Sequence, residues 1–243
     1  MTERLRQTSL MFSGGVDSTT AALMLAEQFD RVHLLTWGNG HGHYRLGRTR
    51  RRVAELRRHS GDRFVHTLES ISDLFADLMP APEEEFDRYR SGFIWCLGCK
   101  IAMHTRSVLY NLEHDIKEIA DGSSRSTGEM VEQMLLSTFM IRDFYSRYGI
   151  RYRTPVYTMS REKEIALLKA KGFRLGFRVG SRFLGIQPKC RPGELYYLPF
   201  LLLNQPPKHD DEQIANFIEE KTARAHVLIE EWCRARGVSA QEC

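Results

Sequence analysis

The stretch Ser13-Gly14-Gly15-Val16-Asp17-Ser18-Thr19 has the residue types of an anion-binding turn. It lies between Ser9–Phe12, a short apolar run that predicts a buried strand, and Asp17–Gln28, where apolar residues recur at helical spacing. Two glycines allow a tight turn and a close backbone approach to a ligand, and the helix start offers free N–H groups and the positive end of its dipole. The lysine of a Walker A loop is absent. We therefore predict a different phosphate loop, in which hydroxyls add donors and Asp17 caps the helix or acts indirectly on Mg²⁺. A plain turn with an Asp cap is the alternative.

Two further segments are placed to reach the same ligand. Thr36-Trp37 ends the predicted strand Arg31–Trp37, and Asp121-Gly122-Ser123-Ser124-Arg125-Ser126-Thr127-Gly128 follows the predicted strand Ile116–Ala120. Open α/β sheets bind ligands at the carboxyl ends of their strands. The second segment is rich in hydroxyl groups and suits a phosphate, and Asp121 is a candidate partner of Mg²⁺. Ordinary packing of Trp37 and a helix-capping role for the second segment are the structural alternatives.

Cysteines are the second group of residues with the means to do chemistry. Five cysteines is an odd number, unlike a disulfide framework, and in a reducing compartment they serve as thiols, metal ligands or catalysts. Cys96-Leu97-Gly98-Cys99 precedes the predicted helix Lys100–Leu112, whose N-terminus would lower a thiol pKa. Cys190 lies in an irregular segment, while Cys233 and Cys243 are expected to be incidental.

The chemistry of Cys96, Cys99 and Cys190 stays open between several hypotheses. Three thiolates fit a [4Fe-4S] cluster with one open iron. Structural zinc would need a fourth ligand, for which His104 is available but not required. Redox catalysis would use one nucleophilic and one persulfide cysteine, one from the pair and one distant. An accidental CxxC is the remaining alternative.

The composition is that of an ordinary globular protein, with 42% hydrophobic and 27% charged residues among 243. A mainly disordered chain is therefore excluded, and no apolar run approaches the roughly 20 residues of a membrane span. The charged N-terminus lacks a signal-peptide core, so we expect a cytoplasmic protein with no membrane partner. The net charge is +4, but seven arginines and one acid lie within Arg45–Arg58. This stretch predicts either a polyanion-binding surface or a solvated helix face.

Strand and helix patterns alternate at short spacing, which predicts an α/β fold with a parallel sheet covered by helices on both faces. Further expected elements of this first part are a basic helix at Tyr44–His59, a strand at Arg63–Thr67 and a helix at Ser70–Leu78. The rest of the chain predicts a helix at Met130–Tyr148, a strand at Arg151–Tyr157, a helix at Ser160–Lys171 capped by Ser160, an irregular stretch at Gly176–Pro199 and an amphipathic helix at Asp210–Arg236. We expect residues 1–200 to form the nucleotide-binding domain and residues 201–243 a C-terminal helical extension.

Ser-Gly-Gly-x-Asp-Ser, here Ser13–Ser18, resembles the signature of the PP-loop ATP pyrophosphatases. The resemblance implies that ATP adenylates a carbonyl oxygen, that pyrophosphate leaves, and that a nucleophile then displaces AMP. It also implies that the loop holds the pyrophosphate end of ATP with Mg²⁺. The Thr36-Trp37 region would contact adenine through backbone atoms, and Asp121-Gly122 would belong to the second nucleotide loop.

The order of this loop, a CxxC and a distant cysteine resembles the tRNA 2-thiocytidine synthetase group. That resemblance implies a [4Fe-4S] cluster on Cys96, Cys99 and Cys190, and the stretch from Thr154-Pro155-Val156 to Ile165 also looks like that group. Two departures are Val16, where the group usually has Lys, and Ser123-Ser124-Arg125, which replaces a His-rich strand end. A second resemblance, to 7-cyano-7-deazaguanine synthase, is weakened because this chain lacks the C-terminal zinc-binding cysteine cluster of that family.

Three functional hypotheses follow. The first is an ATP-dependent tRNA sulfurtransferase with Asp17, Cys99 and Cys190 as catalytic residues and the Arg45–Arg58 helix on the RNA backbone. The second is a synthetase that activates a small carboxylate or a deazapurine, with zinc or no metal. The third is a nucleotide-binding regulatory module that has lost catalysis, against which the intact loop argues. Partners implied by these hypotheses are ATP, a tRNA or a small heterocycle or carboxylate, a sulfur donor protein, and a second copy of the chain in a homodimer.

Overall fold

A five-stranded sheet in which all neighbouring strands are parallel lies at the centre of the protein. The computed structural model describes residues 5–179, 182–184, 187–203, 205 and 207–237. The sheet has the order β4-β2-β1-β5-β6. Its strands are β1 (Gln7–Met11), β2 (Arg31–Gly38), β4 (Phe64–Ser70), β5 (Glu118–Ala120) and β6 (Arg151–Arg153). The predicted parallel α/β fold is confirmed.

The strand order places a switch point at the central strand β1. From β1 the chain builds outward through β2 to β4, and it then returns to add β5 and β6 on the other side of β1. In open α/β sheets such a reversal leaves a crevice at the carboxyl ends of the strands, where ligands bind. The segments that follow β1 and β5 flank this point.

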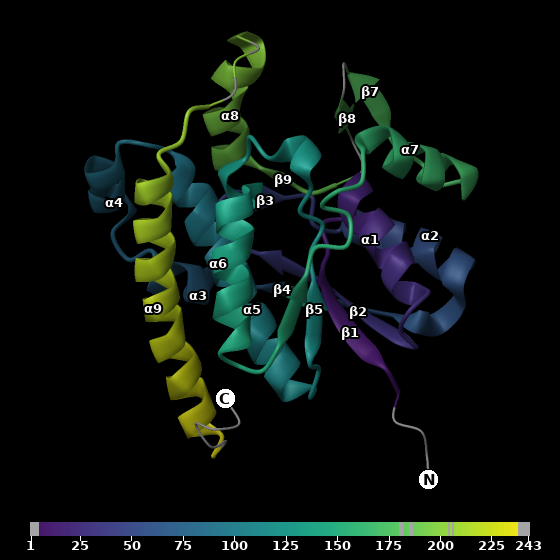
Figure 1. Cartoon of the computed structure of the whole chain (residues 1–243), viewed down its shortest axis with the longest axis horizontal. Coiled ribbons are helices and arrows are strands. Elements are labelled where there is room, and N and C mark those ends of the chain that lie inside the picture. Colours follow the sequence, from purple (N-terminus) through teal and green to yellow (C-terminus); the bar gives the residue numbers. More distant parts are fainter. Residues whose placement is uncertain (1–4, 180–181, 185–186, 204, 206, 238–243) are drawn as a thin grey trace.

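Helices cover both faces of the sheet (Figure 1). On one face lie α1 (Val16–Ala26), α2 (Arg48–Ser60) and α7 (Arg161–Ala170), whose core includes Leu25, Leu34 and Leu56. On the other face lie α3 (Ser72–Leu78), α4 (Pro82–Tyr89), α5 (Phe93–Glu113), α6 (Leu135–Ser146) and α9 (Asp211–Ala235). Their larger core includes Leu35, Tyr145 and Phe217. Leu34 and Leu35 are successive residues of β2 and are both buried, as expected for a strand covered on two sides.

Several short elements lie beyond the carboxyl end of the sheet, at the top of Figure 1. The strands β3 (His43–Tyr44) and β9 (Lys189–Cys190) pair antiparallel, as do β7 (Phe177–Val179) and β8 (Arg182–Leu184). The helix α8 (Arg191–Leu203) follows β9 directly, and the single turns η2 (Arg125–Thr127) and η3 (Val131–Gln133) follow β5. These elements bring distant parts of the sequence over the ends of β1, β2 and β5. A further turn, η1 (Gly61–Arg63), lies at the opposite end of the sheet, directly before β4.

The largest correction to the predicted elements concerns Gly176–Pro199. This stretch was expected to be irregular because of its glycines and prolines, but its described residues hold three short strands and most of α8, which contains Pro199. Tertiary contacts override local propensity here: Tyr197 is buried, and its hydroxyl accepts from the Val131 N–H at 3.1 Å. Because α8 runs across residue 200, the division into residues 1–200 and 201–243 stays a prediction.

Several helices and strands begin or end at other residues than predicted, for reasons that lie in their local contacts. The basic helix begins at Arg48 rather than Tyr44, because Tyr44 pairs with Lys189 in the β3–β9 ladder. The predicted helix at Met130–Tyr148 is divided into η3 and α6 by the extended backbone of Met134. The strand β6 ends at Arg153, shortly before Pro155, which cannot donate to a ladder. The predicted cap Ser160 of α7 is confirmed by its side-chain hydrogen bond to the first turn, and Asp210, predicted as the first residue of the last helix, is instead the N-cap of α9.

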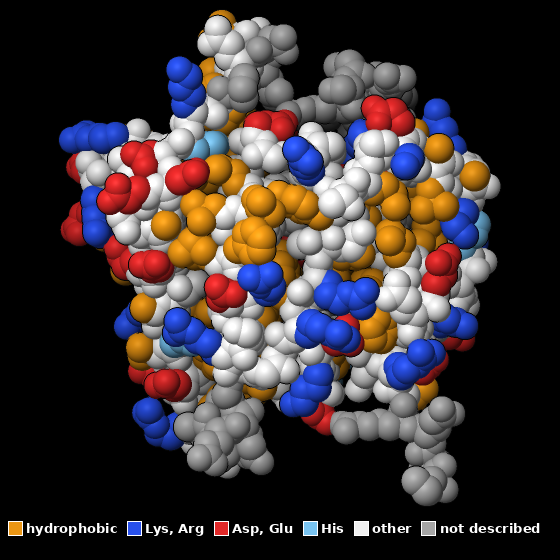
Figure 2. Space-filling model, viewed as in Figure 1, with side chains coloured by type: hydrophobic (Ala, Val, Ile, Leu, Met, Phe, Trp, Pro, Cys, Tyr) orange, Lys and Arg blue, Asp and Glu red, His pale blue; other side chains and the backbone are white. Residues whose placement is uncertain are grey.

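The surface carries both charge signs. On the face shown in Figure 2, Lys and Arg alternate with Asp and Glu, with hydrophobic side chains between them. Among the residues that the structure places, no helix has the length and apolar character needed to cross a membrane.

Candidate active site

The predicted phosphate loop lies between the end of β1 and the start of α1. Gly14 has a φ of 70°, a left-handed conformation that favours glycine. Gly15 is the N-cap of α1 and provides no side-chain cap, so the N–H groups of the first turn are available to an anion. The hydroxyls of Ser13 and Ser18 lie 3.1 Å apart at this helix start. Val16, where the resembling group has Lys, is 2% exposed and packs in the core.

Arg52, an arginine of the basic helix α2, holds the backbone of the phosphate loop in place. The Arg52 side chain is 3% exposed, its Nε donates to the Gly14 carbonyl at 3.3 Å, and its Nη2 donates to the Arg174 carbonyl at 2.6 Å. It also pairs with Glu55. Arg52 is therefore a structural part of the phosphate loop, whereas Arg45, Arg50, Arg51 and Arg58 are exposed. Sequence reasoning missed this role, although Arg52 falls on the same buried helix face as Val53 and Leu56.

The second predicted loop meets the phosphate loop directly. A Cβ on Gly122 would lie 2.7 Å from the main-chain N of Ser18, so only glycine fits where the two loops touch. Asp121 is 1% exposed, and its carboxylate accepts from Lys100 Nζ at 2.6 Å and from the Ser123 N–H and hydroxyl, both at 2.9 Å. Burial alone would raise the pKa of Asp121, but Lys100 and His104 outweigh it and hold the pKa at about 2. Asp121 is thus an ionised, fully engaged group, and a role toward Mg²⁺ remains a prediction.

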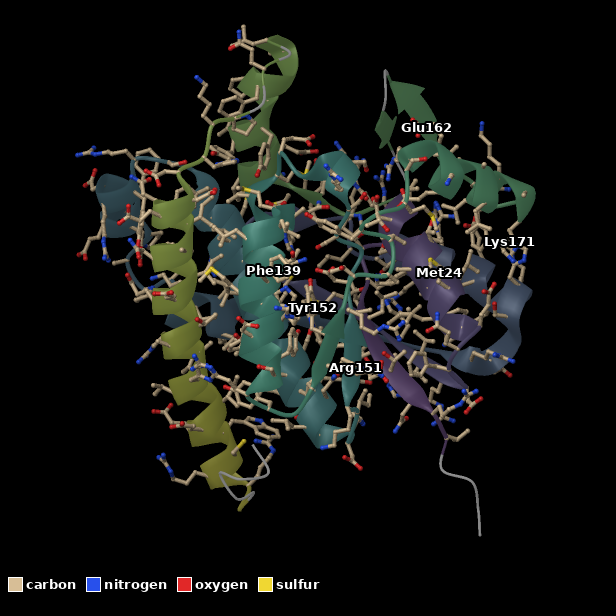
Figure 3. All side chains as sticks on the ribbon, viewed as in Figure 1. Met24, Phe139, Arg151, Tyr152, Glu162 and Lys171 are labelled. Carbon is tan, nitrogen blue, oxygen red and sulfur yellow. The ribbon has the colours of Figure 1, made fainter. Side chains whose placement is uncertain are left out.

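Asp17 is held by an ion pair from α7. Arg161 Nη1 lies 2.7 Å from Asp17 Oδ1 and 3.3 Å from Glu164 Oε2. The Glu164 side chain is fully buried, and its Oε1 has no hydrogen-bond partner among the residues that the structure describes. Burial and the neighbouring Asp17 raise the pKa of Glu164 to about 8, so it carries a proton at neutral pH. Figure 3 labels Glu162 near the start of α7 and Lys171 just after its end, and the helix between them lies beside α1.

The side chains of Thr36 and Trp37 are structural. The indole N–H of Trp37 donates to the Ser107 hydroxyl at 2.9 Å, and the ring is 3% exposed. The Thr36 hydroxyl donates to the Phe12 carbonyl at 2.7 Å. The strand β2 also continues to Gly38, one residue beyond the predicted end. A contact between adenine and the backbone of this region stays a prediction.

The three cysteines singled out in the sequence converge near the ends of β1 and β2. A Cβ on Gly193 would lie 3.7 Å from Cys190 Sγ and 3.9 Å from Cys96 Sγ. Cys99 Sγ accepts from Asn39 Nδ2 at 3.2 Å and lies 3.7 Å from His43 Nε2. The β3–β9 ladder sets Cys190 directly opposite His43. Cys96 and Cys99 come from α5 and Cys190 from β9, so the tertiary structure assembles this group.

The predicted electrostatics of the cysteine pair are wrong. Cys96 and Cys99 do not precede a helix but lie within α5, which begins at Phe93. Burial raises the pKa of Cys96 well above its usual value and that of Cys99 to about 12, and it also raises the pKa of Cys190. A buried thiol in this setting is protonated and inert, whereas a bound metal would reverse the preference by coordinating the thiolate.

Glu132 is a further buried group at the cysteine site that sequence reasoning missed. Its Oε2 accepts from the Tyr197 hydroxyl at 3.2 Å, and burial raises its pKa. Negative charge on Glu132 raises the pKa of Cys96, Cys99 and Cys190 alike. No pattern in the sequence marks Glu132, because it lies in the irregular turn η3.

A metal site is not formed by the side chains as they stand. Across the described part of the chain, no group of three or more His, Cys, Asp and Glu residues is arranged to hold a metal ion. His104, the candidate fourth ligand for zinc, places its Nδ1 2.9 Å from the Tyr145 hydroxyl, in the packing between α5 and α6. Cys243 lies outside the described residues. Three converging thiols are nevertheless the donor set that an iron–sulfur cluster requires, so a cluster is taken up only as a proposal below.

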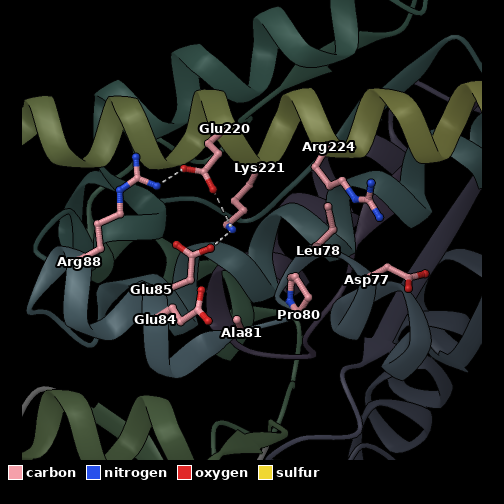
Figure 4. Close-up of a pocket in the computed structure, with 10 residues that line it drawn as sticks. All are labelled: Asp77, Leu78, Pro80, Ala81, Glu84, Glu85, Arg88, Glu220, Lys221 and Arg224. Carbon is pink, nitrogen blue, oxygen red and sulfur yellow. Dashed lines mark hydrogen bonds and ion pairs between the residues drawn. The ribbon is translucent and has the colours of Figure 1, made fainter.

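A separate pocket of about 450 Å³ lies between α3, α4 and α9 (Figure 4). Lys221 pairs there with Glu85, and Arg88 Nη1 lies 2.7 Å from Glu220. None of the predicted site residues lines this pocket. Four of its charged side chains, Glu85, Arg88, Glu220 and Lys221, are paired across the α4–α9 contact, and we assign the pocket no function.

Three solved structures are similar to this chain at low sequence identity. A 4-thiouridine synthetase solved with RNA and bound ATP is 15% identical over 93% of this chain and 53% of its own, with a TM-score of 0.59. A U34-tRNA thiolase, NcsA of Methanococcus maripaludis with its [4Fe-4S] cluster, is 13% identical over 91% of this chain and 74% of its own, with a TM-score of 0.44. A protein of Methanocaldococcus jannaschii described as a predicted tRNA methyltransferase subunit is 17% identical over 68% and 76%, with a TM-score of 0.43.

The comparison with the synthetase establishes the class of fold. No family model matches the chain, and the chain spans only about half of the synthetase. At 15% identity the likeness shows the fold alone, and it agrees with the predicted parallel α/β class.

Proposed function

We propose that this chain is an ATP-dependent sulfurtransferase that acts on tRNA. The observation that carries the proposal is the convergence of Cys96, Cys99 and Cys190 at the carboxyl end of β2, on a site linked to the phosphate loop by the segment from Gln187, which contacts Gly15, to Cys190. A loop for the leaving pyrophosphate and a group of thiols are the two parts that adenylation followed by sulfur transfer requires. The fold shared with a 4-thiouridine synthetase bound to RNA and ATP supports the same class of reaction.

The proposed reaction has two steps. A nucleobase carbonyl oxygen attacks the α-phosphorus of ATP, the bond to the β-phosphate oxygen breaks, and pyrophosphate leaves. A hydrosulfide delivered by a sulfur donor protein then attacks the carbon of the activated carbonyl, the bond from that carbon to the adenylate oxygen breaks, AMP leaves, and the sulfur loses its proton. Binding and charge stabilisation by the protein accelerate such steps without a protein nucleophile in the first of them.

The residues of the phosphate loop would serve the first step. The uncapped start of α1, with the hydroxyls of Ser13 and Ser18, would bind the β- and γ-phosphates. The Thr19 hydroxyl is buried and donates to the Gly15 carbonyl at 2.6 Å, so Thr19 would support the loop from within the helix. Mg²⁺ bound with ATP would neutralise phosphate charge, and Asp17 is the acidic residue in the first turn of α1. Arg161, which pairs with Asp17, orients that carboxylate. Asp121 and Gly122 fix the second loop against the first.

The cysteines would serve the second step. Cys96, Cys99 and Cys190 would hold a [4Fe-4S] cluster, which when bound would supply an open iron for the incoming sulfur. Asn39, which donates to Cys99 Sγ, would hold that sulfur in place. Without a cluster, the alternative is a relay in which Cys99 and Cys190 carry sulfur as a persulfide.

Metal and sulfide analysis of the anaerobically purified protein tests the proposal. We expect brown protein that contains iron and acid-labile sulfide in about stoichiometric amounts. We also expect pyrophosphate release from ATP to depend on the presence of unmodified tRNA. Colourless protein with stoichiometric zinc, and pyrophosphate release with a small carboxylate or deazapurine instead of tRNA, would favour the synthetase hypothesis. No pyrophosphate release with any substrate would favour a binding module.

The exposed arginines of α2 provide a second test through RNA affinity. Replacement of Arg50 and Arg51 by Ala should weaken tRNA binding and lower the slope of log Kd against log salt by about two. Arg142→Ala on α6, whose side chain is 54% exposed, is the matched control and should leave the slope unchanged. An unchanged slope in the double variant would assign the predicted basic helix to ordinary solvation.

A further inference from the structure

One short segment touches both halves of the proposed site. At one end, a Cβ on Gly15 would collide with Oε1 of Gln187, and Gln187 Cδ would lie 3.4 Å away. At the other end, Cys190 pairs with His43 and places its sulfur beside that of Cys96. Gln187–Cys190 therefore joins the phosphate loop to the cysteine site over four residues.

The end at Gln187 has the chemistry of an anion contact. A carboxamide carries two N–H donors beside its oxygen, and rotation about its terminal bond exchanges which of them faces the loop. The side chain is exposed and lies against Gly15, the N-cap of the uncapped helix α1. Arg48 Nη1 donates to the Gln187 carbonyl at 3.4 Å, so a guanidinium also lies at this point. A neutral donor and a cation beside a free helix start all favour a phosphate ligand.

The other end of the segment is anchored. Lys189 and Cys190 form β9, whose backbone pairs with Tyr44 and His43 of β3. The Arg191 N–H donates to the Gly42 carbonyl at 3.1 Å. A ligand at Gly15 that moves Gln187 would therefore also affect the β3–β9 ladder, which holds Cys190.

From this placement we propose that Gln187 is a nucleotide-contacting residue whose carboxamide binds a phosphoryl oxygen at the phosphate loop. We further propose that Gln187–Cys190 couples nucleotide occupancy to the ordering of the strand that carries Cys190. This inference rests on the proposed function, because it requires ATP at the phosphate loop.

Affinity for Mg·ATP tests the contact. Gln187→Ala should raise the Kd about tenfold, the effect of losing one hydrogen bond to a charged group. Gln187→Glu should raise it further, because a carboxylate would face the phosphates. Lys189→Ala, in the same segment but paired with Glu194, is the matched control and should change the Kd less than twofold.

Hydrogen exchange tests the coupling. In the wild type and in Lys189→Ala, saturating Mg·ATP should slow amide exchange in peptides that contain residues 187–193. In Gln187→Ala the same peptides should not be protected, even at an ATP concentration that saturates this variant. Equal Kd values for wild type and Gln187→Ala would overturn the contact, and equal protection in both would overturn the coupling. Failure of the wild type itself to bind ATP is a different result, since it overturns the proposed function.

Discussion

The phosphate loop and the cysteine site lie at the same end of the sheet but are assembled differently. The loop is a run of neighbouring residues between β1 and α1. The cysteine site combines two residues of α5 with one of β9, and it is completed by Asn39, His43 and Glu132 from three other segments. Their environments differ as well: the loop ends in an uncapped helix start, whereas burial raises the pKa of all three thiols.

This difference suggests that the two regions have different requirements. The uncapped helix start offers free N–H groups to an anion, and the exposed Gln187 side chain at Gly15 is the group that would turn as the anion binds. Protonated, buried thiols are not ready for nucleophilic attack or coordination, so the cysteine site requires a ligand or a structural change before it can work. Substitutions at Asp17, Cys190, Gly122 and Glu164 test this contrast between the two regions.

Asp17→Ala should reduce pyrophosphate release at least 100-fold with the fold intact. The change removes the carboxylate at the start of α1 and leaves the Arg161 guanidinium without its 2.7 Å partner. Pyrophosphate release and circular dichroism are the measurements. Asp30→Ala, an exposed carboxylate beyond the other end of α1, is the control and should keep full activity. Unchanged turnover in Asp17→Ala would refute the assignment of the loop.

Cys190→Ala should abolish sulfur transfer or cluster content while the Kd for ATP changes less than about twofold. The substitution removes one of three thiols but leaves Gln187 and the phosphate loop in place. Iron content, thiolated product and ATP affinity are measured together. Retention of both cluster and sulfur transfer would make Cys190 structural and remove the contrast between the two regions.

Gly122→Ala should lower pyrophosphate release about tenfold or more and also lower the Tm. The new Cβ would lie 2.7 Å from the main-chain N of Ser18, and backbone cannot give way as a flexible side chain can. Gly47→Ala is the control, since no atom lies within 4 Å of its Cβ position and its φ is −58°. A fully active Gly122→Ala protein would show that the two loops need not touch.

Glu164→Gln should make Tm less dependent on pH, so that the change of Tm across the pH range is smaller by a few degrees than in the wild type. Because the folded-state pKa of about 8 exceeds the ordinary value of 4.5, the stabilising contribution is complete below about pH 4.5 and is lost as the pH rises through 8. The amide resembles the protonated acid and so removes this loss, raising Tm at pH 8 relative to the wild type. Glu162→Gln on the same helix is the control, because the Glu162 carboxylate is exposed and its pKa is lowered. Equal slopes in wild type and Glu164→Gln would show that Glu164 is ionised.

The loops and the sheet were predictable because their signals are local. The run Ser13–Thr19 has its turn, its helix start and its preceding strand within a few residues of sequence, and the structure places them as predicted. Asp121 and Gly122 were predicted from the strand before them, and their contact with the first loop follows from the parallel sheet. The cap Ser160 was predictable for the same reason.

Roles that depend on burial were not predictable from local pattern. Arg52 was taken with the other arginines as a solvated or RNA-binding group, yet it is buried under Gly14. Packing of the Trp37 side chain was one of two alternatives, and the structure places that side chain against α5, while a backbone contact with adenine stays a prediction. The CxxC was expected to have lowered thiol pKa values, and the packing of α5 reverses that expectation.

Residue types and short spacing alone determined the parallel α/β class, the phosphate loop and the identity of the cysteines, because backbone conformation and helix dipoles act over one or two turns of chain. Only the tertiary structure decided which arginine is buried, that Cys190 lies beside Cys96, and that Gln187 lies on Gly15. Desolvation and contacts between distant segments depend on how the chain is packed, and no window of sequence contains that information.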